Sequence, residues 1–280
     1  MSIILKYAIL DTDFVSNSNI IKTEDRVLAD EVLEFPEYKF FCHQKMVEEL
    51  EDHGTGASRE WLNQKIKSGK ITLYSDEQII KELVDAVGEK GYSYYRSFLK
   101  DGCNMVTSNY YSKYFKALDN WFEADNKYED FLSTLADCEA SIGHKNNYGE
   151  IKAFVLLKTL SFLFEVKPVI FCSDDAGARK GFSNTSLVPC ISILSVFLKL
   201  KYLGRSFEGV WPYYRSFIDW CLNRKFPQTT VKVWIFKAGT YKRESVPIEN
   251  ILRDIYDGKY EARLDGDLQM KRKNEPPVSF

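Results

Sequence analysis

Two acidic residues follow the first apolar run of the chain, in the stretch AILDTDFVSN at residues 8–17. Asp11 comes directly after the run, and Asp13 lies two residues further on. Carboxylates at the end of a buried strand can bind a hard divalent cation such as Mg²⁺ or Mn²⁺, but acids are also common where a strand ends in a polar turn. The pair by itself is compatible with both interpretations.

Acidic residues recur at three later points that a common fold could bring together. Glu49 follows a second strand-like run, Glu150 opens the apolar segment GEIKAFVLLKTLSFLF, and Asp174 and Asp175 follow the run VIFC. Clustered carboxylates raise one another's pKa unless a cation offsets their charge. The set therefore predicts a site for Mg²⁺ or Mn²⁺, of the kind that activates water and stabilises the leaving oxygen of a phosphodiester.

The elements that would position these acids are those of a parallel sheet. Short β-type runs alternate with helical patterns, which indicates an α/β fold with helices covering the sheet. The carboxyl ends of parallel strands meet at one edge, where ligands bind. We expect strands at residues 6–11, 39–43, 70–74, 168–172 and 187–191.

Two segments depart from this alternation. Residues 91–133 are rich in aromatic side chains and predict a helical insertion. Its rings are expected mainly in the core, with a stacking platform for single-stranded RNA as the alternative. Residues 205–280 predict a C-terminal extension made of a helix, a β-hairpin and a loose tail that starts near Gln269. The nuclease-like domain would then span residues 1–204.

Composition excludes several classes of protein. The chain of 280 residues is 45% hydrophobic and 28% charged, which is typical of a globular protein. Its net charge of −2 means that any basic surface for nucleic acid must be local. Six scattered cysteines without a CxxC pair suggest free thiols in a cytoplasmic protein. The most apolar stretch contains Lys158 and is too short to span a bilayer, so no membrane association is expected.

Five stretches carry a family resemblance. They are AILDTDFVSN, KMVEELEDHG, NNYGEIKAFVLL, VIFCSDDAGARKG and VPCISILSVFLKLKYLG. In this order they resemble the motifs of the PIN-domain ribonuclease superfamily, which includes the toxins of bacterial toxin–antitoxin pairs, over roughly residues 5–90 and 135–204. The resemblance implies a three-layer α/β/α domain with a five-stranded parallel sheet ordered 3-2-1-4-5. It also implies a Mg²⁺- or Mn²⁺-dependent endoribonuclease that acts on RNA, with an antitoxin as a candidate protein partner.

The resemblance also assigns roles to individual residues. The implied catalytic and metal-binding acids are Asp11, Glu49, Glu150 and Asp175, with Asp174 as a competing ligand. The residues expected to support them are Thr12, Asp13 and Ser173. Asp137 or Glu139 could replace Glu150 as the third acid. Arg179 and Lys180 are candidates for binding substrate, although Arg179 could equally pair with a neighbouring carboxylate.

Two other functions are compatible with the same residues. AILDTDFV also resembles the first motif of haloacid-dehalogenase-type phosphotransferases, in which Asp11 would be the phosphorylated nucleophile. A PIN-like scaffold that binds RNA or protein without cutting is the non-enzymatic alternative. The insertion and the extension have no counterpart in the small toxins, so the resemblance does not identify the substrate or the partner.

Overall fold

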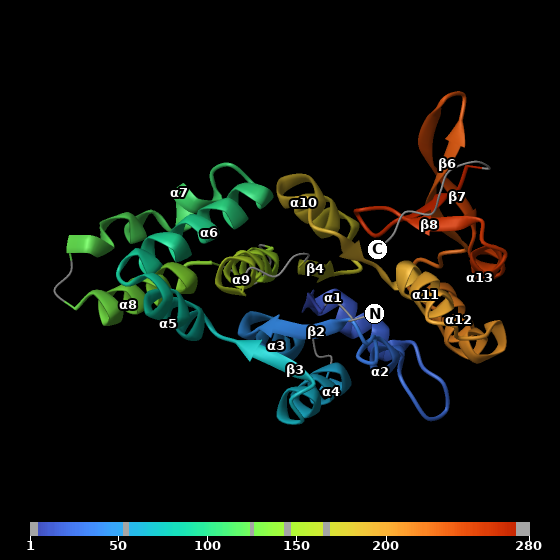
Figure 1. Cartoon of the computed structure of the whole chain (residues 1–280), viewed down its shortest axis with the longest axis horizontal. Coiled ribbons are helices and arrows are strands. Elements are labelled where there is room, and N and C mark those ends of the chain that lie inside the picture. The colour runs from blue at the N-terminus through green and yellow to red at the C-terminus, as the bar shows by residue number, and fades with distance from the viewer. Residues whose placement is uncertain (1–4, 53–55, 124–125, 143–146, 165–168, 273–280) are drawn as a thin grey trace.

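The central element of the fold is a five-stranded parallel sheet. The computed structural model describes residues 5–52, 56–123, 126–142, 147–164 and 169–272, and its strand order is β3-β2-β1-β4-β5, as expected (Figure 1). The strands are β1 (Lys6–Leu10), β2 (Tyr38–His43), β3 (Ile71–Tyr74), β4 (Val169–Cys172) and β5 (Cys190–Ile191). Strand β5 is shorter than the predicted 187–191, and residue 168 of the predicted fourth strand lies outside the described residues.

Side chains along each strand alternate between two hydrophobic cores, one on each face of the sheet. Ala8 and Leu10 of β1 face one core, and Ile9 faces the other. The first face is covered by α1 (Thr12–Ile20), α2 (Leu28–Val32), α3 (Gln44–Asp52), α4 (Gly56–Lys67), α11 (Ile193–Tyr202) and α12 (Phe207–Leu222). The opposite face is covered by α5 (Asp76–Val87), α6 (Lys90–Val106), α9 (Tyr148–Phe164) and α10 (Ala176–Ser186). The predicted three-layer α/β/α architecture is therefore confirmed.

The aromatic insertion extends the second of these layers. After α6 it continues through α7 (Tyr110–Tyr114), the 3₁₀ helix η1 (Lys116–Glu123) and α8 (Lys127–Ala140). Figure 1 shows these elements side by side at the edge of the molecule that is remote from the C-terminal sheet. Tyr95 and Phe115 are fully buried, and Tyr94 is among the partly exposed rings. Most of the insertion's described aromatic side chains therefore contribute to the core.

The C-terminal extension contains more structure than a helix and a hairpin. Its elements after α12 are β6 (Thr230–Lys237), β7 (Thr240–Pro247), α13 (Ile248–Tyr256), β8 (Tyr260–Ala262) and β9 (Leu268–Met270). Its four strands form a second sheet in the order β7-β6-β9-β8. Gln269 and Met270, expected in a loose tail, lie in β9, while residues 273–280 lie outside the described residues.

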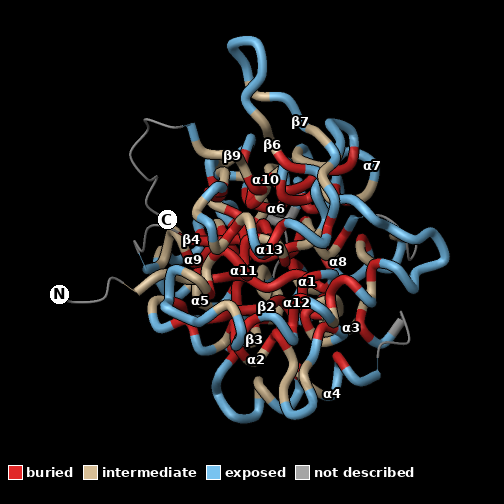
Figure 2. Tube along the Cα trace, turned by 90° about the vertical axis from the view of Figure 1, so that its right-hand side faces the viewer, coloured by how far each residue is buried: buried red, intermediate tan, exposed pale blue. Residues whose placement is uncertain are grey.

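The extension packs directly onto the first sheet. The main-chain N–H of Cys190 in β5 donates to the carbonyl of Leu264 at 2.7 Å, and the Ser192 hydroxyl donates to the carbonyl of Gly266 at 2.6 Å. Side chains from α13 and β9 belong to the same hydrophobic core as those of α1 and α11. Figure 2 shows this continuous buried interior, with exposed residues toward the outer loops. Within the described ranges, no helix is long and apolar enough to cross a membrane.

Candidate active site

Asp11 is held at the carboxyl edge of the sheet, between its two central strands. It directly follows β1, and its main-chain N–H donates to the carbonyl of Cys172, the last residue of β4, at 3.0 Å. The hydroxyl of Ser173 donates to Asp11 Oδ2 at 2.7 Å. Strand order reverses between β1 and β4, which is where ligands bind in open parallel sheets.

Glu49 is held from two sides. The hydroxyl of Thr12 donates to Glu49 Oε2 at 2.6 Å, and the main-chain N–H of Gly149 donates to Oε1 at 3.1 Å. These contacts connect α3 to the first residues of α1 and of α9, although Glu49 and Gly149 are 100 positions apart in the chain. A Cβ atom at Gly149 would collide with both carboxylate oxygens of Glu49. The absence of a side chain at this position therefore allows the carboxylate to approach the helix.

Glu150 adds a third carboxylate from the first turn of α9. Its pKa is raised to about 8, first by burial and then by the negative charges of Asp11, Asp175 and Glu49. These are the acids expected to form the site, and they are close enough to affect the ionisation of Glu150. The cluster consequently favours a bound proton or a cation at Glu150 near neutral pH.

Asp11 shows the same effect. Burial raises its pKa to about 7, the hydrogen bond from Ser173 opposes this shift, and the charges of Asp13 and Glu49 add to it. Two acids of one rim thus have pKa values near or above neutrality. Strongly shifted carboxylates at the carboxyl edge of a parallel sheet are candidates for a functional site.

Asp174 and Asp175 diverge although they are adjacent. Asp175 is the N-cap of α10, where its Oδ1 accepts from the main-chain N–H of Ala178 at 2.8 Å. Asp174 turns toward α1 and α11, accepting from the Asn17 side chain at 2.8 Å and from the main-chain N–H of Ile193 at 3.3 Å. The charge of Asp175, rather than that of Asp174, is among those that raise the pKa of Glu150. Asp13 is exposed on the first turn of α1.

The alternative third acids lie elsewhere. Asp137 is exposed on α8. Glu139 accepts a hydrogen bond from Lys152 at 2.6 Å and another from the hydroxyl of Tyr148. Glu139 thus belongs to an ion-pair network behind α9, whereas Glu150 faces the rim acids.

That network surrounds a fully buried lysine. Lys152 Nζ lies 2.7 Å from Asp76 Oδ2 and 2.9 Å from the hydroxyl of Tyr95. His43, the last residue of β2, lies 3.3 Å from Asp76. Burial acts to raise the pKa of Asp76, but Lys152 and His43 hold it well below its ordinary value. The ion pairs fix the start of α9, and thereby the position of Glu150.

The two basic residues expected to bind substrate are placed differently. Arg179 is buried; its guanidinium donates to the carbonyl of Ser173 at 3.0 Å and pairs with Asp267 at 2.9 Å. Lys180 is exposed on α10. Arg179 therefore connects the acid-bearing loop after β4 with the C-terminal sheet.

The donor set fits a hard cation chemically, because carboxylates that repel one another are the ligands that Mg²⁺ and Mn²⁺ prefer. The side chains do not form a ready-made ligand group: among the described residues, no three or more His, Cys, Asp or Glu side chains are arranged to hold a metal ion. Cation binding would require these carboxylates to move into a common ligand group.

Sequence reasoning did not single out Gly149 and Asn17, which contact these acids. Gly149 could have been noticed in the sequence because it directly precedes Glu150 in the third motif. Its contact with Glu49 could not, because that contact joins segments far apart in the chain. Comparisons with protein-family models, with curated proteins and with solved structures find no match for this chain.

Proposed function

We propose that the protein is a PIN-like endoribonuclease that depends on Mg²⁺ or Mn²⁺. The observation that carries this proposal is that Asp11 and Glu150, at the carboxyl edge of a parallel sheet, have pKa values raised by burial and then by neighbouring carboxylates, with Glu49 acting on both and Asp175 on Glu150. The order of the motifs in the sequence and the strand order support it. Carboxylates that raise one another's pKa in this way gain most from a divalent cation.

Each residue has a distinct role in this proposal. Asp11, Glu49 and Glu150 would hold the cation, with Asp175 as a further ligand. Thr12 orients Glu49 and Ser173 orients Asp11 through the hydrogen bonds already described. A bound cation would supply a water of lowered pKa and a positive charge for the phosphodiester oxygens.

A second candidate is a PIN-like RNA-binding scaffold without activity. The arrangement of the described acids favours it, because they form no metal-ligand group in their present positions. The two candidates differ in one measurable property. The nuclease requires cation binding at the rim, whereas the scaffold requires only RNA binding.

Cleavage of a labelled single-stranded RNA with Mn²⁺, and with EDTA as the metal-free condition, tests the proposal. Asp11→Asn and Glu150→Gln should each abolish cleavage while the circular dichroism spectrum stays native. Asp137→Asn, a change at an exposed acid on α8, is the matched control and should retain full activity. Cleavage that persists in Asp11→Asn and in EDTA would refute the nuclease. The scaffold would be favoured if the protein binds RNA, does not cleave it, and shows no Mn²⁺ binding in a calorimetric titration.

A further inference from the structure

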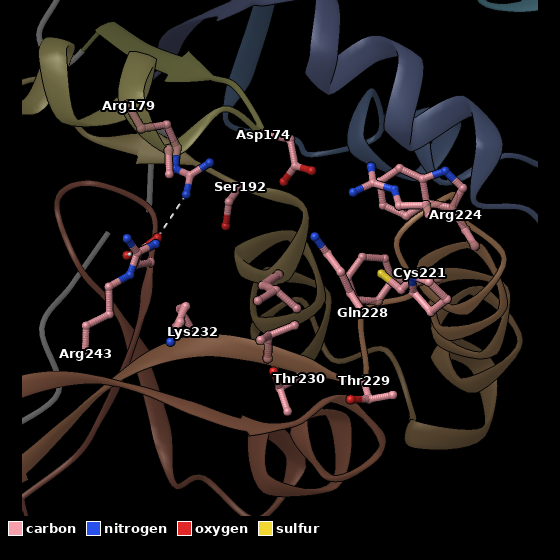
Figure 3. A pocket seen from close by; sticks show the side chains of 17 residues that line it. Asp174, Arg179, Ser192, Cys221, Arg224, Gln228, Thr229, Thr230, Lys232 and Arg243 are labelled. Carbon is pink, nitrogen blue, oxygen red and sulfur yellow. Dashed lines mark hydrogen bonds and ion pairs between the residues drawn. The ribbon is translucent and has the colours of Figure 1, made fainter.

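A hollow of about 580 Å³ lies between the candidate active site and the C-terminal extension (Figure 3). Asp174 and Ala176, from the loop after β4 and the start of α10, form its wall on the side of the acids. The opposite walls come from the end of α12 and from the hairpin of β6 and β7. The hollow therefore begins next to Asp175, and most of its lining belongs to a segment outside the resemblance described above.

The lining of this hollow is positively charged. Its cations are Arg179, Arg224, Lys232 and Arg243, and its acids are Asp174 and Asp267. This leaves a formal charge of +2 in a chain whose net charge is −2. Asp267 is shared by two of the cations, at 2.9 Å from Arg179 and 3.2 Å from Arg243. The basic surface that the overall charge does not provide is thus present locally.

Two of the cations are free to meet an anion. Among the described contacts, neither Arg224 nor Lys232 is in an ion pair, and both side chains are exposed. The Arg224 guanidinium lies over the ring of Trp220, 3.6 Å from its centroid, which keeps the side chain in place. Figure 3 shows Arg224 and Gln228 directed into the hollow, with Arg179 and Arg243 on the far side.

The uncharged lining suits phosphate groups and nucleotide bases. Thr229, Thr230 and Gln228 offer hydroxyl and amide donors of the type that contact nucleic-acid backbones. Phe226, two residues before Gln228 and outside the lining, is 75% exposed, and unpaired bases stack on such exposed rings. An acidic peptide would meet the cations equally well, but it has no base to stack on the Phe226 ring, which among the described contacts has only Lys225 Nζ over it, 5.7 Å from the centroid.

We infer that this hollow binds the sugar–phosphate backbone of single-stranded RNA, next to the point at which the strand reaches the acids. The choice of RNA rests on the proposed nuclease function, whereas the binding surface rests on the lining residues. The extension would then serve to hold the substrate beside Asp11 and Glu150. Arg179, which the sequence predicts as a substrate-binding residue, would not contact the RNA directly, because its guanidinium is already paired with Asp267.

Fluorescence anisotropy with the full chain and a labelled oligouridylate of about 12 nucleotides tests this inference. EDTA is present throughout, so binding is measured without cleavage. Arg224→Glu and Lys232→Glu should each weaken binding about tenfold or more, and each lost phosphate contact should reduce the slope of log K against log salt by about 0.7. Thermal unfolding of both variants should match that of the unchanged protein, because both side chains are exposed.

Lys242→Glu is the matched control. Lys242 is an exposed lysine of the same hairpin, paired with Ile235 across the strands, and it is not part of the lining. The control should bind RNA within about twofold of the unchanged protein. The inference would be overturned by any of three results. The unchanged protein does not bind RNA, both hollow variants bind it as tightly as the unchanged protein, or the control loses as much affinity as they do. If RNA binding behaves as expected but no Mn²⁺-dependent cleavage occurs, the proposed nuclease function is refuted and the RNA-binding hollow is not.

Discussion

The hydroxyl of Thr12 donates a 2.6 Å hydrogen bond to Glu49 Oε2, joining the residue after Asp11 to the acid of α3. The two residues are 37 positions apart, and each belongs to a different acidic motif. The contact sets the direction of the Glu49 carboxylate before any ligand binds.

Thr12→Val should lower activity by roughly 10–100-fold, as is usual when the hydrogen bond that orients a metal ligand is removed. The measurement is the rate of RNA cleavage as a function of Mn²⁺ concentration, and the half-saturating concentration should rise. Thr12→Ser keeps the hydroxyl and should restore most of the rate. If Thr12→Val cleaves RNA as fast as Thr12→Ser and the unchanged protein, Thr12 has no part in positioning Glu49.

Gly149→Ala places a methyl group where the Glu49 carboxylate now lies. Glu49 must move, and we expect cleavage to fall at least about tenfold, because catalytic geometry tolerates little displacement. Gly209→Ala is the control, since a Cβ at that helical glycine meets only the Ser206 hydroxyl, at an ordinary 3.4 Å. A normal rate in Gly149→Ala would remove Glu49 from the proposed ligands.

Asp11 should make the metal-free protein less stable as the pH rises. Its folded-state pKa of about 7 lies above the ordinary 3.8, so between these values the folded protein holds a proton that the unfolded chain releases. The stabilising contribution is complete below about pH 4 and is lost as the pH rises through about 7. Asp11→Asn should therefore raise the free energy of unfolding by roughly 1–3 kcal/mol at about pH 8 and leave it nearly unchanged at about pH 4.

Urea unfolding at both pH values, in EDTA, measures this difference. Asp137→Asn, a change at an exposed side chain, is the control and should alter the free energy of unfolding by less than about 0.5 kcal/mol. Added Mn²⁺ should stabilise the unchanged protein more at about pH 8 than at about pH 5.5, since protons compete for the same oxygens. Destabilisation of the Asp11→Asn variant at high pH would contradict the raised pKa that burial and the neighbouring charges give Asp11.

Lys152→Met should destabilise the protein by about 3–5 kcal/mol, because removing one partner leaves Asp76 and Glu139 without their buried cation. Lys45→Met is the matched change at a partly exposed ion pair with Glu48 and should cost less than about 1 kcal/mol. Thermal or urea unfolding compares the two. Similar small effects would show that the buried network contributes little to holding α9.

The parallel sheet could be anticipated from local patterns, whereas its strand order, which the structure confirms, was implied only by the resemblance to PIN domains. Alternating apolar runs and helices indicate parallel strands, and residues 8–10 show in the structure the alternation that a strand buried on both faces requires. The acids at the carboxyl ends followed from the same reasoning. The charge of Asp11 raises the pKa of Glu150 although the two residues are far apart in sequence.

What could not be anticipated depends on contacts between distant segments. Strands β8 and β9 have three residues each, too few to show a periodic pattern. The burial of Lys152 in an apolar helix depends on Asp76 and Glu139, which lie on other helices. The different directions of Asp174 and Asp175 depend on Asn17 and on the N-cap of α10. No local rule distinguishes two adjacent aspartates.

The docking of Leu264 onto Cys190 has a consequence for how the protein is made. Strand β5 is the edge of the first sheet, and its N–H group at Cys190 is satisfied by a carbonyl 74 residues later in the chain. An uncovered strand edge is prone to pair with other chains. During synthesis this edge stays open until residue 264 has left the ribosome, so the nascent protein must pass through an interval in which it is prone to aggregate.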